Sequence, residues 1–319
     1  MKTKKFISET NRVLEKALLF VLILTVHSAA AQDKTEITSS GEAVMQITSV
    51  PEIKLGYTHR LIFPFLQGGS PLTADNNINL ALGAEATPIS ISGFVNTVWT
   101  PIAFIELALG GRIGSGWPLN LFGSDVYGIG LNVPGDGGKS EYEGSAFDSL
   151  YWKLHFGAAF QFDLAAIFPG GWNHVVFRTY HEIFYHGSTR AGKGQSWYYE
   201  GGEGENCNGF NYYGSFLLGY QMPIFLNMIG VMTEMNLYLY DTPGRKDWGD
   251  DLIQWHLSGV LNFKITRQFE ILAAAQFRTL RNFNENNWED LYYRYRTVDA
   301  SNPQRMEFHR VAVVLTYRF

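Results

Sequence analysis

Residues 307–319, EFHRVAVVLTYRF, decide the fold of this chain. Counting back from the last residue, every second position is apolar, at Phe319, Tyr317, Leu315, Val313 and Val311. Arg318, Thr316 and Arg310 lie between them. Successive side chains of a β-strand point to opposite faces, so this alternation predicts a strand with one apolar face. We expect the strand to run to the end of the chain and to finish inside a sheet.

The same alternation recurs along most of the sequence. It is clearest where apolar side chains share one face, at Trp152, Leu154, Phe156, Ala158, Phe160, Phe162 and Leu164. A tilted strand needs about 9–11 residues to cross a bilayer, whereas strands of soluble proteins usually have about five or six. Long, half-apolar strands favour a membrane barrel over a soluble β-sandwich or a solenoid. The expected fold is all-β: a transmembrane antiparallel up-and-down β-barrel of about 12 strands, with roughly 10–14 left open.

The number of strands leaves one element to be found. About eleven strands can be recognised, and bacterial single-chain barrels have an even number. Either residues 42–50 or part of 115–149 supplies the missing one. Residues 32–50 are therefore a periplasmic leader or a short first strand, and 51–319 form the barrel. Long connections are expected outside the membrane, at about 115–149, 188–208, 241–251 and 282–304.

The pattern formed by Val313, Leu315, Tyr317 and Phe319 resembles the assembly signal of Gram-negative-type outer-membrane β-barrels. That resemblance implies two partners: outer-membrane lipid, and barrel-assembly machinery that engages the C-terminal strand. Further stretches resemble uncharacterised treponema-type spirochaete outer-membrane proteins, at 63–68, 70–77, 99–104, 114–117, 172–181, 219–226 and 238–244. This second resemblance implies a location and a barrel fold, and it brings no activity with it.

The N-terminus has the pattern of a secretory signal. Lys2, Lys4 and Lys5 precede an apolar run at 17–26, and alanines occupy 29–31. The run is well short of the ~20 residues that a transmembrane helix needs. Residues 1–31 are therefore predicted to be a cleaved signal peptide that directs the chain across the inner membrane. We expect the mature protein in the outer membrane.

Composition argues against several function classes. With 25 basic and 30 acidic residues, the chain is acidic, which argues against a nucleic-acid partner. Cys207 is the only cysteine, so the chain cannot form an internal disulfide or a cysteine-based zinc cluster. The acidic loops lack the ordered ligand spacing of a calcium loop, and no metal or cofactor is predicted. The sequence leaves the oligomeric state open.

Charged residues on the polar faces of the strands are the main candidates for a functional site. The predicted lumen-lining residues are Lys153, His155, Asp163, Arg178, Glu182, Glu234 and His256. Inward charges of a mid-sized barrel either line an aqueous pore or pair with one another in a filled lumen. The first arrangement gives a passive small-solute channel and the second a structural barrel, and both remain open.

A catalytic alternative rests on His186 and Ser188. The two residues stand two positions apart and share one face of a strand, so they could act as base and nucleophile. They resemble the His-x-Ser arrangement of outer-membrane phospholipases, although Thr189 and Arg190 replace the Asn-Gly-Arg that follows it there. A third hypothesis is a surface-binding protein, an adhesin, whose long loops contact a partner.

Overall fold

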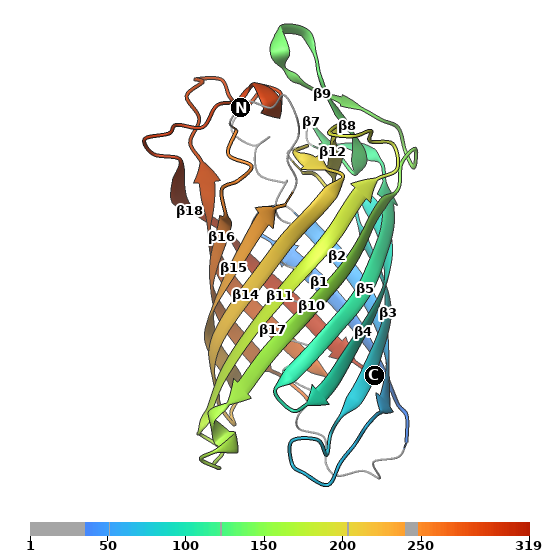
Figure 1. The fold of residues 1–319 in the computed structure, drawn as a ribbon, viewed down its shortest axis with the longest axis vertical. Helices are drawn as coiled ribbons and strands as arrows, with labels where there is room; N and C mark the ends of the chain where they lie inside the picture. Colours follow the sequence, from blue (N-terminus) through green and yellow to red (C-terminus); the bar gives the residue numbers. More distant parts are fainter. Residues whose placement is uncertain (1–35, 51, 122, 203, 240–247) are drawn as a thin grey trace.

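The computed structural model describes residues 36–50, 52–121, 123–202, 204–239 and 248–319. These residues contain a closed barrel of twelve antiparallel strands, each paired with the next barrel strand along the chain (Figure 1). The barrel strands are β1 (Thr38–Thr48), β2 (Glu52–Pro64), β3 (Asn77–Thr87), β4 (Ser90–Ile102), β5 (Ile105–Gly116), β10 (Tyr151–Asp163), β11 (His174–Ser188), β14 (Gly209–Gln221), β15 (Leu226–Tyr238), β16 (Gln254–Lys264), β17 (Phe269–Arg281) and β18 (Gln304–Arg318). The prediction of an all-β up-and-down barrel of about twelve strands is confirmed. The predicted signal segment, 1–31, lies outside the described residues.

Strand β1 supplies the strand that the sequence left undecided. It pairs with β2 on one side and with β18 on the other. In the second pairing, Met45 lies opposite Leu315 and Ile47 lies opposite Val313. The last strand therefore closes the barrel against the first, and residues 38–48 belong to the wall.

Side chains alternate between the two faces of the wall. Outward positions are apolar and exposed, among them Leu109, Leu154, Phe156, Ile183, Leu218 and Val231. Inward positions hold buried charged side chains such as Arg178, Glu234 and Arg310. Tilted strands of 11 to 15 residues with an apolar outer surface can cross the hydrocarbon core of a bilayer, so the fold is a transmembrane β-barrel. No helix among the described residues is long and apolar enough to cross a membrane.

The two ends of the barrel differ. The C-terminus lies at the end that carries the connections between β4 and β5 and between β16 and β17, here called the terminal end (Figure 1). Phe319 and Tyr317 lie there on the outer face, with 5.1 Å between their ring centroids, and Leu315 and Val313 follow on the same face, half-buried. The role of these four residues in assembly stays a prediction.

At the opposite end, the loop end, long connections pack into a cap (Figure 1). We define the cap as the described residues of 117–150, 189–208, 248–253 and 282–303. Its strands are β6 (Pro118–Leu121), β7 (Ser124–Tyr127), β8 (Ile129–Pro134), β9 (Ser140–Glu143), β12 (Ser196–Tyr199) and β13 (Asn206–Cys207). Short 3₁₀ turns span Asp136–Gly138 and Tyr293–Tyr295 in the cap and Leu164–Ala166 at the terminal end. Ile129, Trp197, Trp248 and Tyr293 are fully buried, so the cap has an apolar core of its own.

Candidate functional site: the lumen and its mouth

The predicted lumen residues lie on the inner face of the wall, and two of them are joined to each other. Lys153 Nζ of β10 lies 2.6 Å from Glu182 Oε1 of β11. Asp163 Oδ2 lies 2.7 Å from His174 Nδ1, where β10 and β11 meet at the terminal end. The Tyr213 hydroxyl donates a hydrogen bond of 2.6 Å to Glu234 Oε1.

The other three predicted residues, Arg178, His155 and His256, contact residues that were not predicted as lumen residues. Arg178 Nη2 lies 2.6 Å from Glu106 Oε2 of β5. His256 is buried, and its ring centroid lies 6.2 Å from that of His309. His155 is half-buried on β10, where its ring approaches the backbone of β5 at Gly110.

Four charged residues on the inner face of β2, β3 and β5 were not among the predicted lumen residues: Lys54, Glu85, Glu106 and Arg112. Arg112 donates two hydrogen bonds to Glu85, from Nη1 to Oε2 at 2.7 Å and from Nη2 to Oε1 at 3.2 Å. Lys54 Nζ lies 3.5 Å from the same Glu85 Oε2. With Glu106, Lys153, Arg178 and Glu182, these residues form what we call the charged wall. Each of these residues falls on the polar face of its strand, so the alternation of side chains along the strand could have identified it as inward-facing. The alternation could not have identified its ion-pair partner.

All ion pairs between barrel strands run along the wall within the described part of the chain. They join adjacent strands, as in Lys54–Glu85, or strands separated by a single strand, as in Arg310–Glu52 across β1 at 3.5 Å. At the terminal end, Arg318 contacts Glu42 of β1 and Glu270 of β17, its two neighbours. None of these pairs between described residues bridges the lumen. The charges are therefore held against the wall.

Part of the inner face of β14 to β18 is apolar, although the same strands also carry buried inward charges such as Glu234, Arg278 and Arg310. Strands β14 to β18 contribute one packed cluster, which we call the apolar wall: Leu217, Met232, Val260, Leu272, Ala312 and Val314. Val44 of β1 packs against it. The lumen therefore carries charged side chains on both halves, and the apolar wall is a packed cluster on one of them.

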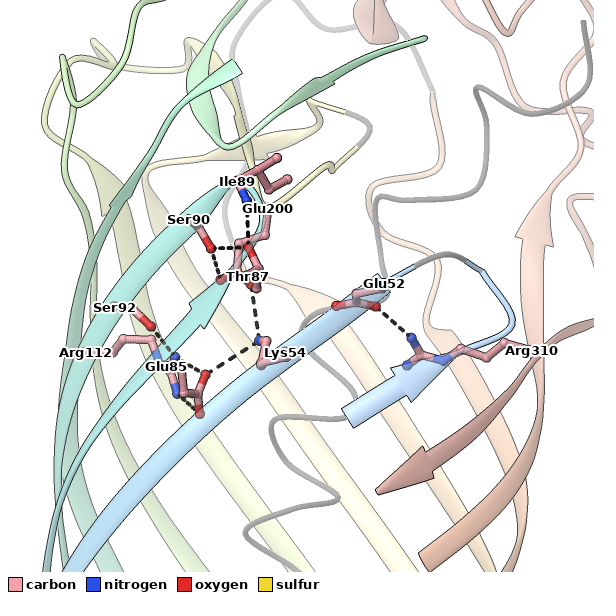
Figure 2. A network of polar contacts seen from close by, with 10 residues as sticks. All are labelled: Glu52, Lys54, Glu85, Thr87, Ile89, Ser90, Ser92, Arg112, Glu200 and Arg310. Atoms are coloured by element: carbon pink, nitrogen blue, oxygen red, sulfur yellow. Dashed lines mark hydrogen bonds and ion pairs between the residues drawn. The ribbon is translucent and has the colours of Figure 1, made fainter. Parts of the chain in front are cut away.

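The side chain that links the charged wall to the cap is Glu200. It belongs to residues 189–202, which follow β11 and which we call the strap. Figure 2 shows Glu200 pointing to β2 and β4: Ser90 Oγ donates a 2.8 Å hydrogen bond to its Oε1, and Lys54 Nζ lies 3.4 Å from its Oε2. Lys54 is thus shared by Glu200 and Glu85 (Figure 2).

A second ionic contact joins the cap to β17 at the barrel mouth. Glu205 Oε2 lies 2.8 Å from Arg281 Nη1 of β17, and its Oε1 lies 3.3 Å from Arg296 Nη1. Arg281 also donates to the carbonyl oxygen of Gly249 at 2.9 Å. The cap is therefore tied to the wall on two sides.

The predicted base and nucleophile, His186 and Ser188, lie on the inner face of β11 beneath the cap. Both are buried, His186 against the rings of Tyr151, Phe184 and Trp197. The Ser188 hydroxyl forms a 2.7 Å hydrogen bond with the Ser149 hydroxyl. The pair therefore faces away from the lipid that a phospholipase would attack. The described residues contain no group of three or more His, Cys, Asp or Glu side chains that could hold a metal ion.

Comparison with known proteins returns bacterial barrels of low similarity. No protein-family model and no curated protein matches the chain. The β domain of the Bordetella autotransporter BrkA has 8% identity and a TM-score of 0.43, covering 88% of this chain and 98% of that one. OmpT of Vibrio cholerae has 6% identity and a TM-score of 0.35, with coverages of 91% and 99%. Salmonella typhi OmpF, in complex with daunomycin, has 8% identity and a TM-score of 0.29, with coverages of 91% and 99%.

At these identities and TM-scores, none of the three proteins bears on what this chain does. They also add nothing to the resemblance to treponema-type proteins, which stays a prediction.

Proposed function

We propose that this chain is an outer-membrane channel that passes small polar solutes along the charged wall of its lumen. The observation that carries the proposal is the direction of the ion pairs. Because Arg112, Glu85 and Lys54 pair along the wall, their side chains do not bridge the lumen. Charges paired in this way supply a polar surface that replaces part of the hydration of a passing solute, without the cost of an unpaired buried charge.

Three features support the outer membrane as the location. The barrel is closed, so no strand edge is left unpaired in lipid. Its outer face is apolar along strands long enough to cross the bilayer. Its longest connections, which follow β5, β11, β15 and β17, all lie at the loop end, as the long loops of outer-membrane barrels do at one end. The predicted signal peptide is consistent with this location.

Permeation through reconstituted protein tests the proposal. Purified wild type in planar bilayers is expected to give discrete conductance steps, and liposomes that carry it are expected to swell in small polar solutes. Arg112→Ala removes a long side chain from the charged wall while Lys54 remains beside Glu85, so the step size should rise, by about twofold in proportion to the widened polar path.

The matched control is Leu272→Ala, which shortens a side chain of the apolar wall and should leave the step size unchanged. Silent bilayers and non-swelling liposomes for both wild type and Arg112→Ala would refute the channel and leave a structural barrel. Equal effects of the two variants would refute the charged wall as the route.

A further inference from the structure

The strap crosses the mouth of the barrel. It leaves β11, and Glu200 contacts β2 and β4, although β10, β5, β4 and β3 separate β11 from β2 around the wall. In a ring of twelve strands, β2 lies almost opposite β11. The strap therefore passes β10 and β5 on its way to β4 and β2, and it covers the part of the mouth above the charged wall.

The backbone at the tip of the strap is adapted to deliver the Glu200 side chain. Glu200 has φ of +50°, a left-handed conformation that non-glycine residues rarely adopt, and glycine follows it at 201. Its amide donates to the Gly128 carbonyl at 2.7 Å, and the Gly201 amide donates to the Tyr127 carbonyl at 2.8 Å. Glu200 itself is only 2% exposed. The strap tip is thus held by the cap and inserts one carboxylate into the wall.

The approach of the strap to β5 depends on a missing side chain. A Cβ at Gly114 would lie 2.7 Å from the Tyr199 hydroxyl oxygen, closer than any real Cβ contact. The Tyr199 ring stacks on Tyr151 at 4.1 Å between centroids. Because Tyr199 packs closely against β5 and β10, the next residue, Glu200, lies next to the charged wall.

The contact of Glu200 with the wall can break without leaving Lys54 unpaired. Lys54 lies within 3.5 Å of both Glu200 and Glu85, and Arg112 holds Glu85 in place. If Glu200 withdraws, Lys54 keeps Glu85 as a partner, and Glu200 can be solvated at the mouth. Opening therefore leaves Lys54 paired with Glu85. An unpaired buried cation would be the main free-energy cost of breaking an ordinary buried ion pair.

We propose that the strap is the gate of this channel and that Glu200, seated on Lys54 and Ser90, is the latch that holds it shut. This proposal rests on the proposed channel function. The closed state is the one described above, and the open state is reached when Glu200 leaves β2 and β4. A gate of this kind needs two states that differ by only a few kcal/mol, which the shared Lys54 allows.

Single-channel recording with matched variants tests the latch. Glu200→Gln keeps the size of the side chain and removes its charge, so the open probability should rise about tenfold, the effect of losing one charge-assisted contact. Ser90→Ala removes the hydrogen bond from the other side and should change the open probability in the same direction. The control is Glu141→Gln, which neutralises a carboxylate on β9, a strand separated by β8 from β12 of the strap, and should leave gating unchanged.

A second readout does not depend on conductance. Asn96 lies on the inner face of β4, and a cysteine there, in a Cys207→Ser background, reports access from the loop end. A membrane-impermeant thiol reagent added to intact cells should label Asn96→Cys slowly, and about tenfold faster when Glu200→Gln is also present. Far-UV circular dichroism of each variant checks that the barrel has formed.

The two readouts separate the latch from the channel. Faster labelling in silent bilayers would support the latch and overturn the channel. Conductance steps with unchanged gating and labelling in Glu200→Gln would overturn the latch and leave the channel in place. Silent bilayers with unchanged labelling would overturn both.

Discussion

The charged wall and the apolar wall enclose the same lumen but are built in opposite ways. On β2, β3, β5, β10 and β11, long side chains pair along the wall, as in Arg112–Glu85 and Arg178–Glu106. On β14 to β18, shorter apolar side chains such as Leu272 and Val260 contact one another directly. The charged wall therefore provides polar surface, and the apolar wall provides packing.

The contrast separates two tasks that a barrel with a polar lumen must combine. Apolar contacts on the inner face stabilise the barrel by removing apolar surface from water, and charge screening by salt in the lumen does not weaken them. Paired charges add little net stability, because desolvation offsets much of their attraction, but they keep a hydrated surface. We therefore expect substitutions on the two walls to have different consequences.

The largest effect is expected from a charge placed in the apolar wall. Val260→Asp puts a carboxylate among Leu272, Met232 and Val314, where no cation of the cluster can pair with it, and should lower the free energy of unfolding by about 4 kcal/mol. Urea unfolding in lipid vesicles measures this. Asn96→Asp adds the same charge to the inner face of β4 beside the charged wall and should cost less than about 1 kcal/mol. Similar losses in the two variants would mean that the walls do not differ in polarity.

The second-largest loss of stability is expected from a cavity in the apolar wall. Leu272→Ala removes a buried side chain that its neighbours cannot fully replace, so the free energy of unfolding should fall by about 3 kcal/mol. The control is Leu218→Ala on the outer face, where lipid chains refill the space and the loss should be about 1 kcal/mol. Equal losses, in the same unfolding experiment, would contradict a packed inner cluster.

Breaking one pair of the charged wall should have a smaller effect. Glu106→Gln removes the carboxylate that lies 2.6 Å from Arg178 and should lower the free energy of unfolding by about 2 kcal/mol, because both side chains are buried. High salt should reduce the difference between wild type and variant only slightly, since buried pairs are poorly screened. A difference that vanishes in 1 M salt, the concentration at which the screening length is about 3 Å, would show that the pair is solvated.

The smallest effect is expected in the cap. Arg190 pairs with Glu143 and Asp148 at the surface, and Arg190→Ala should change the free energy of unfolding by less than about 1 kcal/mol. Thermal unfolding followed by intrinsic fluorescence measures this. A loss as large as that of Glu106→Gln would mean that burial does not distinguish the two kinds of pair.

Much of the barrel could be predicted because strand alternation is a local property. The faces assigned to Lys153, Arg178, Glu182 and His256 follow from parity, and the inward positions of these residues agree with it. Strand β1 was left undecided because Ser39, Ser40 and Gly41 weaken its alternation, and only pairing with β2 and β18 defines it. Lys54, Glu85 and Arg112 were on polar faces too, but their importance appeared only with their partners.

Residues of the cap were harder to foresee. The segments 115–149 and 188–208 are rich in glycine and polar residues, which predicts loops and gives no register. Their fold depends on contacts between distant segments, such as Trp197 with Tyr151 and Trp248 with Tyr293. Cys207, a lone cysteine in the sequence, lies buried in this core beside the Tyr293 hydroxyl.

The sequence by itself determined a long-stranded barrel with an apolar outer face and a charged inner one, because a period of two fixes the side of every residue in a strand. Only the tertiary structure decided which charges meet. Closing the ring sets which strands are neighbours, and it brings residue 200, from a loop on one side of the mouth, onto Lys54 on the other. No local pattern encodes that contact, since it depends on the curvature of the whole wall and on the path of the strap across it.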